Sequence, residues 1–157
     1  MFSAKNLAKI GLIAAIYAVV TIALAPISYG AVQVRVSEAL TVLPFISPLA
    51  IPGLFIGCLV ANFYSAAGIY DVIFGSLATL IAALITWKMP SPKLAPLPPV
   101  ITNGLVIGTM LSVLFDLPLV ATIIYVALGE LVACYALGYP LLVWLEKRPD
   151  LKRLFSL

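Results

Sequence analysis

Six polar side chains stand nearly alone within long apolar stretches, and they are the candidates for binding chemistry. They are three carboxylates, one guanidinium and two amides: Arg35, Glu38, Asn62, Asp71, Asn103 and Glu130. A carboxylate accepts two adjacent N–H donors, while a guanidinium or an amide can donate to a carbonyl oxygen. If these six side chains surround one cavity, they would bind a flat, polar ring.

Glu130 is the most informative of the six. It lies about eleven residues into the last apolar segment, roughly 16 Å along a helix, which is near the middle of a membrane span. A carboxyl group at that depth costs about 2.5–3.5 kcal/mol to insert. The neighbouring helical positions, Ala127, Ala133 and Cys134, are small and leave space beside it. We expect Glu130 to face a ligand, and a bond to a neighbouring helix is the alternative.

Asp71 is expected at the start of a helix. Aspartate is a good helix N-cap and suits the positive end of the helix dipole. Gly75, Ala78 and Ala82 follow on the same helix face and leave room beneath the carboxylate. Capping and ligand binding are therefore both open, and they are compatible. Asp116 is expected to be an outer turn residue.

Arg35 and Glu38 are three residues apart where a second helix is expected to begin, at Ser37. They would form a local ion pair, which contributes little if exposed, or would face a cavity and offer donors and an acceptor. Asn62 and Asn103 would bridge helices or contact the ligand. Four tyrosines are candidates for stacking on a ring: Tyr17, Tyr29, Tyr64 and Tyr125.

The composition requires a bilayer as the solvent for these residues. Hydrophobic residues make up 64% of the chain and charged residues only 10%, whereas ordinary soluble domains have about 25% charged residues. The net charge of +3 comes from basic residues that flank apolar segments, which indicates membrane topology rather than nucleic-acid binding. Pro26 directly follows the first apolar run, so we expect that run to be a retained span and not a cleaved signal peptide.

Prolines and turn residues divide the apolar sequence into six predicted helices. They are expected at about 7–25, 37–46, 50–67, 71–87, 100–115 and 119–146, with an extended loop at 26–36 and a proline-rich loop at 89–99. We therefore predict an all-α membrane bundle in one domain, residues 1–157. Six spans place both termini and the proline-rich loop on one side. That side would carry eight of the nine basic residues, so it is predicted to be cytoplasmic.

Several functional classes have no support in the sequence. The chain has no histidine and no G-x-x-x-x-G-K-[ST] phosphate loop, and Cys58 and Cys134 both lie in apolar runs. We predict no catalytic, metal or cofactor site, and any ATP hydrolysis must occur in another chain. Two rivals stay open: a small membrane-embedded enzyme acting on lipids, and a stand-alone proton-coupled carrier that uses Glu130 and Asp71.

Pairs of small residues spaced by four suggest close helix contacts. Such pairs allow two helix backbones to approach each other, within a bundle or between proteins. The chain has three of them: Ala14 with Ala18, Gly53 with Gly57, and Gly104 with Gly108. Packing inside the bundle and docking of another membrane protein are both consistent with this pattern.

Three segments resemble the queuosine-precursor transporter family, QueT. They are YGAVQVRVSEALTVLPF (29–45), AIPGLFIGCLVANFYS (50–65) and DVIFGSLATLIAALIT (71–86). Members of this family are substrate-binding (S) components of energy-coupling factor transporters. The resemblance implies six membrane helices, with a ligand held near the outer side under the loop after the first helix.

The resemblance also implies partners and a ligand. The partners are a membrane T component and two ABC-type ATPases, and the S component topples to deliver its ligand. An Ala-x-x-x-Ala pattern on the first helix contacts the T component, and Ala14 and Ala18 match it. The implied ligand is a 7-deazaguanine, such as 7-aminomethyl-7-deazaguanine or its nitrile analogue, with another vitamin-like molecule as the alternative.

That ligand fits the candidate residues. Glu130 or Glu38 would accept the paired N–H donors of a guanine edge, and Asp71 would neutralise an aminomethyl cation. Arg35, Gln33 or an asparagine would donate to the ring carbonyl. Because unmatched polar groups in a buried site are costly, an analogue without these edges should be rejected.

Overall fold

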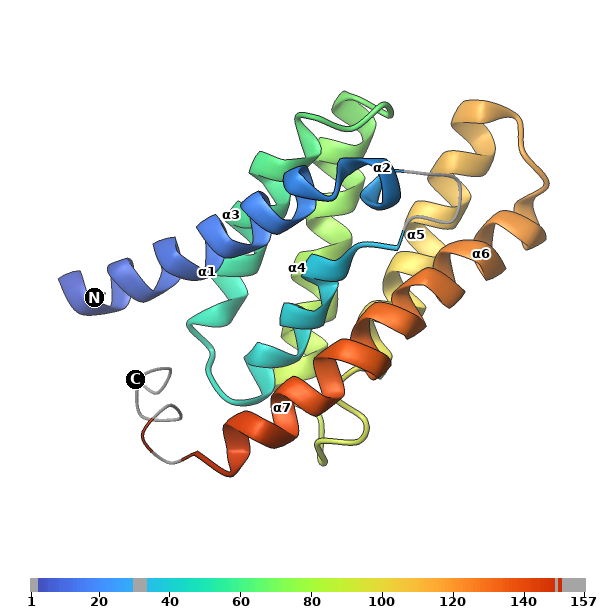
Figure 1. The fold of residues 1–157 in the computed structure, drawn as a ribbon. Helices are drawn as coiled ribbons and strands as arrows, with labels where there is room; N and C mark the ends of the chain where they lie inside the picture. Colours follow the sequence, from blue (N-terminus) through green and yellow to red (C-terminus); the bar gives the residue numbers. More distant parts are fainter. Residues whose placement is uncertain (1–2, 30–33, 149, 151–157) are drawn as a thin grey trace.

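The computed structural model describes residues 3–29, 34–148 and 150 (Figure 1). Every regular element within these ranges is a helix, so the predicted all-α class is confirmed. The helical segments follow the order and the approximate positions predicted from the sequence. The differences lie mainly at their ends and in the kind of helix.

The first helix, α1, spans Ala4–Ala23. Ser3 caps its start, because the Ser3 Oγ accepts a backbone N–H of the first turn at 3.3 Å. The prediction of extended chain from residue 26 is wrong at its beginning. Ala25–Ser28 form a short helix, α2, with Pro26 in its first turn, where a proline costs no helical hydrogen bond. Residues 30–33 of the predicted loop lie outside the described residues.

The next two helices are shorter than a membrane span. The second predicted helix is a 3₁₀ helix, η1, over Val36–Phe45. The third, α3, covers Ala50–Asn62 and ends there rather than near residue 67. Turns follow α3 as far as Gly68, whose positive φ of 58° glycine adopts more readily than other residues. This reversal of the chain explains the early end of α3.

The fourth predicted helix opens with a π-helical turn, η2 (Asp71–Gly75), and continues as α4 (Ser76–Trp87). Two helical residues already precede Asp71, so the aspartate does not begin the helix. After the proline-rich connection, α5 spans Leu97–Phe115. It begins earlier than the predicted residue 100, because the first helical turn accepts prolines.

The last predicted helix is one rod over Leu119–Glu146, with the predicted ends. It consists of α6 (Leu119–Leu131), a π-helical segment η3 (Val132–Gly138) and α7 (Tyr139–Glu146). The turn between α5 and the rod is made by Asp116, whose φ of 51° ends α5 in the left-handed region. This confirms Asp116 as a turn residue.

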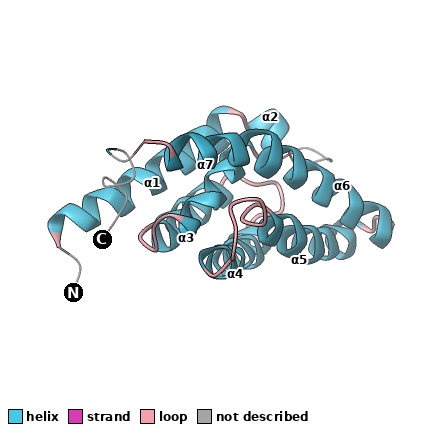
Figure 2. Ribbon diagram, turned by 90° about the horizontal axis from the view of Figure 1, so that it is seen from below, coloured by secondary structure: helices cyan, strands magenta, loops and turns pink. Residues whose placement is uncertain are grey.

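The helices form two layers around η1. Helices α3, α4 and α5 lie side by side, and α1 and the rod lie across them (Figure 2). The 3₁₀ helix η1 contacts α1, α3, α4 and both η3 and α7 of the rod. It therefore lies at the centre of the bundle, and side chains that point from η1 are surrounded by other helices.

The chain is a membrane protein by the length and composition of its helices. Three are long and apolar enough to cross a bilayer: Ala4–Ala23, Leu97–Phe115 and Leu119–Glu146. The other apolar helices, Val36–Phe45, Ala50–Asn62 and Asp71–Trp87, are shorter. A bilayer core about 30 Å thick needs about 20 helical residues, so α3 alone does not reach across it. The arrangement of six crossing helices stays a prediction.

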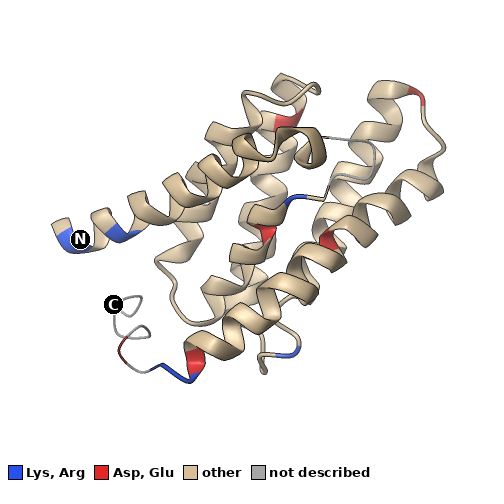
Figure 3. Ribbon diagram, viewed as in Figure 1, with Lys and Arg blue, Asp and Glu red and all other residues tan. Residues whose placement is uncertain are grey.

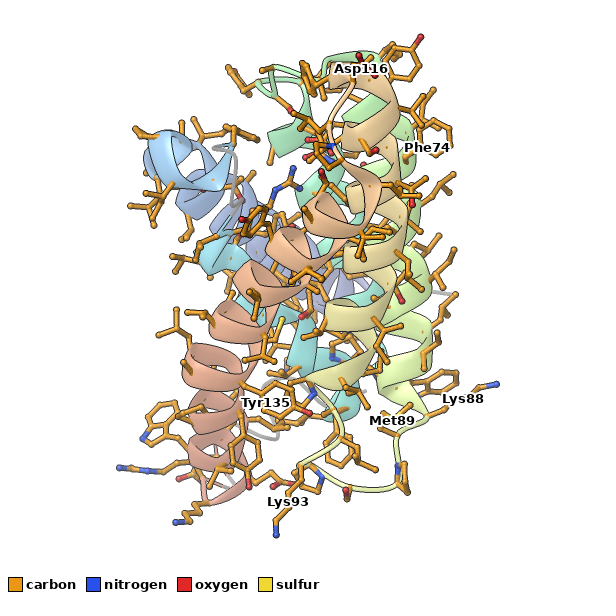
Figure 4. All side chains as sticks on the ribbon, turned by 90° about the vertical axis from the view of Figure 1, so that its right-hand side faces the viewer. Phe74, Lys88, Met89, Lys93, Asp116 and Tyr135 are labelled. Atoms are coloured by element: carbon orange, nitrogen blue, oxygen red, sulfur yellow. The ribbon has the colours of Figure 1, made fainter. Side chains whose placement is uncertain are left out.

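Charged residues distinguish the two ends of the bundle. Among the described residues, most lysines and arginines lie along the edge where α1 begins and α7 ends (Figure 3), whereas Arg35 is buried inside the bundle. Lys88 and Lys93 lie at one end of the molecule and Asp116 at the other (Figure 4). The positive-inside rule would assign the lysine end to the cytoplasm.

Glycines bring two pairs of helices into backbone contact. A Cβ at Gly57 of α3 would lie 2.7 Å from the carbonyl oxygen of Ala14 on α1. A Cβ at Gly108 of α5 would lie 2.6 Å from the Cα of Ile123 on α6. There is no room for a side chain at either position. These glycines therefore serve packing inside the bundle.

Gly57→Ala should lower the free energy of unfolding by about 1–3 kcal/mol, because the added methyl group meets backbone that cannot move aside easily. Unfolding in detergent micelles by denaturant would measure the loss. Gly11→Ala is the matched control, since a Cβ at Gly11 has no atom within 4 Å, and alanine favours a helix over glycine by about 1 kcal/mol. Equal stability of the Gly57→Ala variant and the unmodified protein would contradict the packing interpretation.

Candidate functional site

Arg35 points from the start of η1 into the bundle, where it is buried. Its Nη2 donates to the Asp71 Oδ2 at 2.6 Å and forms an ion pair, and its Nη1 donates to the Asn62 Oδ1 at 3.1 Å. The Nε donates to the backbone oxygen of Ser28 at 3.4 Å, and the Cζ lies 5.6 Å from the centre of the Tyr29 ring. One guanidinium therefore connects α2, α3 and η2.

Asn62 holds the other side of this contact. Its Nδ2 donates to the backbone oxygen of Asp71 at 2.8 Å, within the π-helical turn. A Cβ at Gly75 would lie 2.6 Å from the Asp71 Oδ1 and 2.7 Å from the Asn62 Nδ2, so a glycine is needed there. Such π-helical turns are frequent at functional sites. We call Arg35, Asn62 and Asp71 the ion-pair group.

A second polar group lies where η1 meets α5 and the rod. The Tyr17 hydroxyl of α1 donates to the Glu38 Oε1. The buried Asn103 side chain of α5 lies near the carboxyl groups of both Glu38 and Glu130. The Cys134 Sγ is 3.7 Å from the Glu130 Oε2 and 3.5 Å from the backbone oxygen of Glu38. We call Glu38, Asn103 and Glu130 the carboxyl group cluster.

The two groups form one buried polar site. Arg35 and Glu38 are three residues apart at the start of η1, which places the ion-pair group next to the carboxyl group cluster. Glu130 is only 3% exposed, so its carboxyl group faces the bundle rather than lipid. The structure thus brings together all six side chains that the sequence singled out. Their contact with a ligand stays a prediction.

Three acceptor atoms of this site have no hydrogen-bond partner among the described residues. They are the Glu38 Oε2, the Asp71 Oδ1 and the Asn103 Oδ1. Buried polar atoms are almost always hydrogen-bonded, and leaving one unpaired costs about 1–3 kcal/mol. A molecule that satisfies these atoms must supply N–H or O–H donors. Within the described ranges, no group of three His, Cys, Asp or Glu side chains is placed to hold a metal ion.

Two local contacts considered from the sequence are wrong: an ion pair of Arg35 with Glu38, and helix capping by Asp71. Arg35 pairs with Asp71, 36 positions further along the chain, rather than with Glu38. The Asp71 carboxylate bonds to that guanidinium and caps no helix among the described residues. Ser37 does not begin η1, and its hydroxyl instead lies 2.6 Å from the Thr21 Oγ1.

The four tyrosines divide into two pairs. Tyr17 is fully buried beside Glu38, and the Tyr29 hydroxyl donates to the backbone oxygen of Ala61 at 2.6 Å. Tyr64 and Tyr125 are 66% and 54% exposed, so they lie away from the site. Gln33, the other predicted donor, lies outside the described residues.

Two contacts of the site were missed. Sequence reasoning gave Tyr17 a stacking role and Cys134 a packing role, whereas both contact the glutamates. A signal was present for Tyr17, because it shares one face of α1 with Thr21, and both are polar residues within an apolar helix. Cys134 follows Glu130 by four residues, which is one helical turn.

Ala14 and Ala18 face into the bundle. They are 8% and 7% exposed, and Ala14 lies against Gly57 of α3. Gly11 and Ala15 of the same helix are exposed. The alanine pair therefore takes part in packing inside the bundle.

Comparisons with known proteins give a consistent picture. A family model described as "QueT transporter" matches residues 7–147. A queuosine precursor transporter QueT from Lactococcus lactis subsp. cremoris (strain MG1363) is 40% identical over 78 residues. The match covers 48% of this chain and 46% of that protein, so the chain spans about half the length of the curated relative. No solved structure is significantly similar.

Arg35→Gln and Asp71→Asn should each lower the free energy of unfolding by about 3–5 kcal/mol, because each leaves an uncompensated buried charge. The double variant should lose less than the sum of the two losses, with a coupling energy of about 1–3 kcal/mol. Denaturant unfolding of all four proteins in the same detergent measures this. Additive losses would show that the two side chains do not depend on each other.

Proposed function

Because the chain belongs to the QueT transporter family, we propose that it is the substrate-binding membrane component of an importer for a queuosine precursor. The proposed ligand is a 7-deazaguanine. The relative from Lactococcus lactis is named for a queuosine precursor. The observation that carries the proposal is the buried polar site with three unpaired acceptors.

The chemistry of the site matches the donors of such a ligand. A guanine-type ring presents adjacent N–H groups on one edge, which a carboxylate or an amide oxygen accepts. The Glu38 Oε2, the Asp71 Oδ1 and the Asn103 Oδ1 are available for this purpose. A site with paired donors and acceptors rejects analogues that lack the matching groups.

We propose a role for Asp71 that differs from the one expected from the sequence. The sequence suggested that the Asp71 carboxylate neutralises an aminomethyl cation. The Arg35 guanidinium, 2.6 Å away, already neutralises this carboxylate. The carboxyl groups of Glu38 and Glu130 have no such ion pair among the described residues. We therefore assign the cationic part of the ligand to these two glutamates.

Transport is proposed to follow the energy-coupling factor scheme. The chain would bind its ligand from outside, topple in the membrane and release the ligand into the cytoplasm. A T component and two ABC-type ATPases would supply the energy, in line with the absence of a phosphate loop from this sequence. Both termini would be cytoplasmic, next to the end that carries Lys88 and Lys93 (Figure 4).

A second candidate is a stand-alone proton-coupled carrier. The observation that favours it is the pair of buried carboxyl groups, Glu38 and Glu130, because chains of acidic residues within membranes often carry protons. Liposomes that contain this chain alone distinguish the two candidates. Ligand uptake driven by a pH gradient, without ATP or partners, would support the carrier.

Glu130→Gln should weaken binding of 7-aminomethyl-7-deazaguanine at least tenfold, a loss of about 1.4 kcal/mol. The reason is that a neutral amide replaces the Glu130 carboxyl group, which accepts hydrogen bonds and carries a negative charge or shares one with Glu38. Isothermal titration calorimetry in detergent measures the affinity. Asp116→Asn is the control, since this exposed turn residue lies at the far end of α5. Unchanged affinity of the Glu130→Gln variant would remove this residue from the site.

The double substitution Gly11→Leu with Ala15→Leu should reduce co-purification with the T component while leaving ligand affinity unchanged. These positions are exposed on α1, so bulky side chains there obstruct a partner without disturbing the bundle. Ala14→Leu is the comparison, because leucine at this buried position should lower stability as well as assembly. Normal co-purification of the double variant would exclude docking through this face.

A further inference from the structure

The buried site contains more acidic groups than basic ones. The charged or ionisable side chains of the two groups are one guanidinium, Arg35, and three carboxyl groups, those of Glu38, Asp71 and Glu130. Arg35 is paired with Asp71 at 2.6 Å, so this ion pair is neutral as a unit. Glu38 and Glu130 remain, and together they would carry two negative charges if both were ionised.

The surroundings of these two glutamates provide few donors. Asn103 lies near both carboxyl groups, and a single amide nitrogen carries only two N–H donors. The Tyr17 hydroxyl donates to the Glu38 Oε1, and the Cys134 thiol lies 3.7 Å from the Glu130 Oε2. The Glu38 Oε2 has no partner among the described residues.

The titratable and amide groups around the pair come from several of the elements that surround it. They are Tyr17 on α1, Arg35 before η1, Cys58 on α3, Asp71 on η2, Asn103 on α5 and Cys134 on η3. Of these, only Arg35 and Asp71 are ordinarily charged at neutral pH. Since they neutralise each other, the environment offers the glutamates little compensation for two negative charges.

Two carboxyl groups that share one site do not both ionise easily, because like charges repel and burial penalises each charge. We propose that Glu38 and Glu130 share one proton in the ligand-free protein and exchange it for the cationic aminomethyl group of the ligand. The site then selects a heterocycle that carries a cation over a neutral one. The ligand in this statement rests on the proposed function, whereas the shared proton does not.

The exchange conserves charge. The O–H bond of the protonated carboxyl group breaks, and its proton passes to water. The ammonium group of the ligand then donates hydrogen bonds to the two carboxylates. One positive charge leaves the site and another enters it, so the buried charge stays at the same value. The nitrile analogue brings no cation, so it should bind without releasing a proton.

A dependence of affinity on pH follows from this exchange. At low pH the free site holds its proton more strongly, and the ligand must displace it. If one proton leaves for each ligand bound, the Kd rises about tenfold for each unit by which the pH falls, as proton linkage requires. An alkylammonium group stays protonated up to a pH of about 10, so the ligand itself does not change in the neutral range.

Calorimetry tests the exchange with 7-aminomethyl-7-deazaguanine and its nitrile analogue as the two ligands. Titrations at one pH in phosphate and in Tris, which differ in ionisation enthalpy, count the released protons. We expect about one proton per aminomethyl ligand and none for the nitrile. Glu130→Gln and Glu38→Gln should each abolish the release, and Asp116→Asn should retain it. Binding of the aminomethyl ligand without proton release would overturn the exchange.

Infrared spectroscopy tests the shared proton without a ligand. The ligand-free protein should show the C=O absorption of a protonated carboxyl group, which shifts in D₂O and disappears in Glu130→Gln and in Glu38→Gln. The band should persist in Asp116→Asn. Absence of the band from the unmodified protein would overturn the shared proton. Presence of the band together with failure of both deazaguanines to bind would overturn the ligand assignment and the exchange.

Discussion

The ion pair of Arg35 with Asp71 is the interaction on which the rest of the site depends. A charge in an apolar bundle is very costly unless an opposite charge and hydrogen bonds compensate it. The guanidinium reaches this compensation only if the chain before η1, the end of α3 and the π-helical turn η2 all meet at one point. The same requirement explains Gly75, since any side chain there would displace Asp71 or Asn62.

Helix packing supplies the frame for this meeting point. Gly57 lets α1 approach α3, and Gly108 lets α5 approach α6, so that the backbones touch. These contacts leave η1 at the centre, with the Glu38 side chain directed toward α1 and its backbone oxygen near Cys134 of the rod. Both π-helical segments, η2 and η3, contain or adjoin residues of the polar site. Both departures from regular α-helix thus lie at the buried polar site.

The two parts of the site are satisfied to different degrees. The guanidinium of Arg35 binds three acceptors and stacks near Tyr29, whereas the two glutamates share a few donors and leave one oxygen unpaired. The bonded guanidinium holds the helices in place, whereas the Asp71 Oδ1 and the Glu38 Oε2 are still free to accept hydrogen bonds. This division suits a binding protein, because the energy of an unpaired buried acceptor becomes available to a ligand that brings donors.

The sequence by itself determined the membrane environment, the helical class and five of the six helix positions within a few residues. Apolar length and proline placement act locally, so they can be read along the chain. It also identified all six polar residues of the site, because a charge within an apolar stretch is conspicuous wherever it lies. Only the tertiary structure decided that Arg35 binds Asp71 rather than Glu38, that Tyr17 contacts Glu38, and that Ala14 packs inward. These are contacts between residues far apart in the chain, and they depend on how whole helices pack, which no local pattern contains.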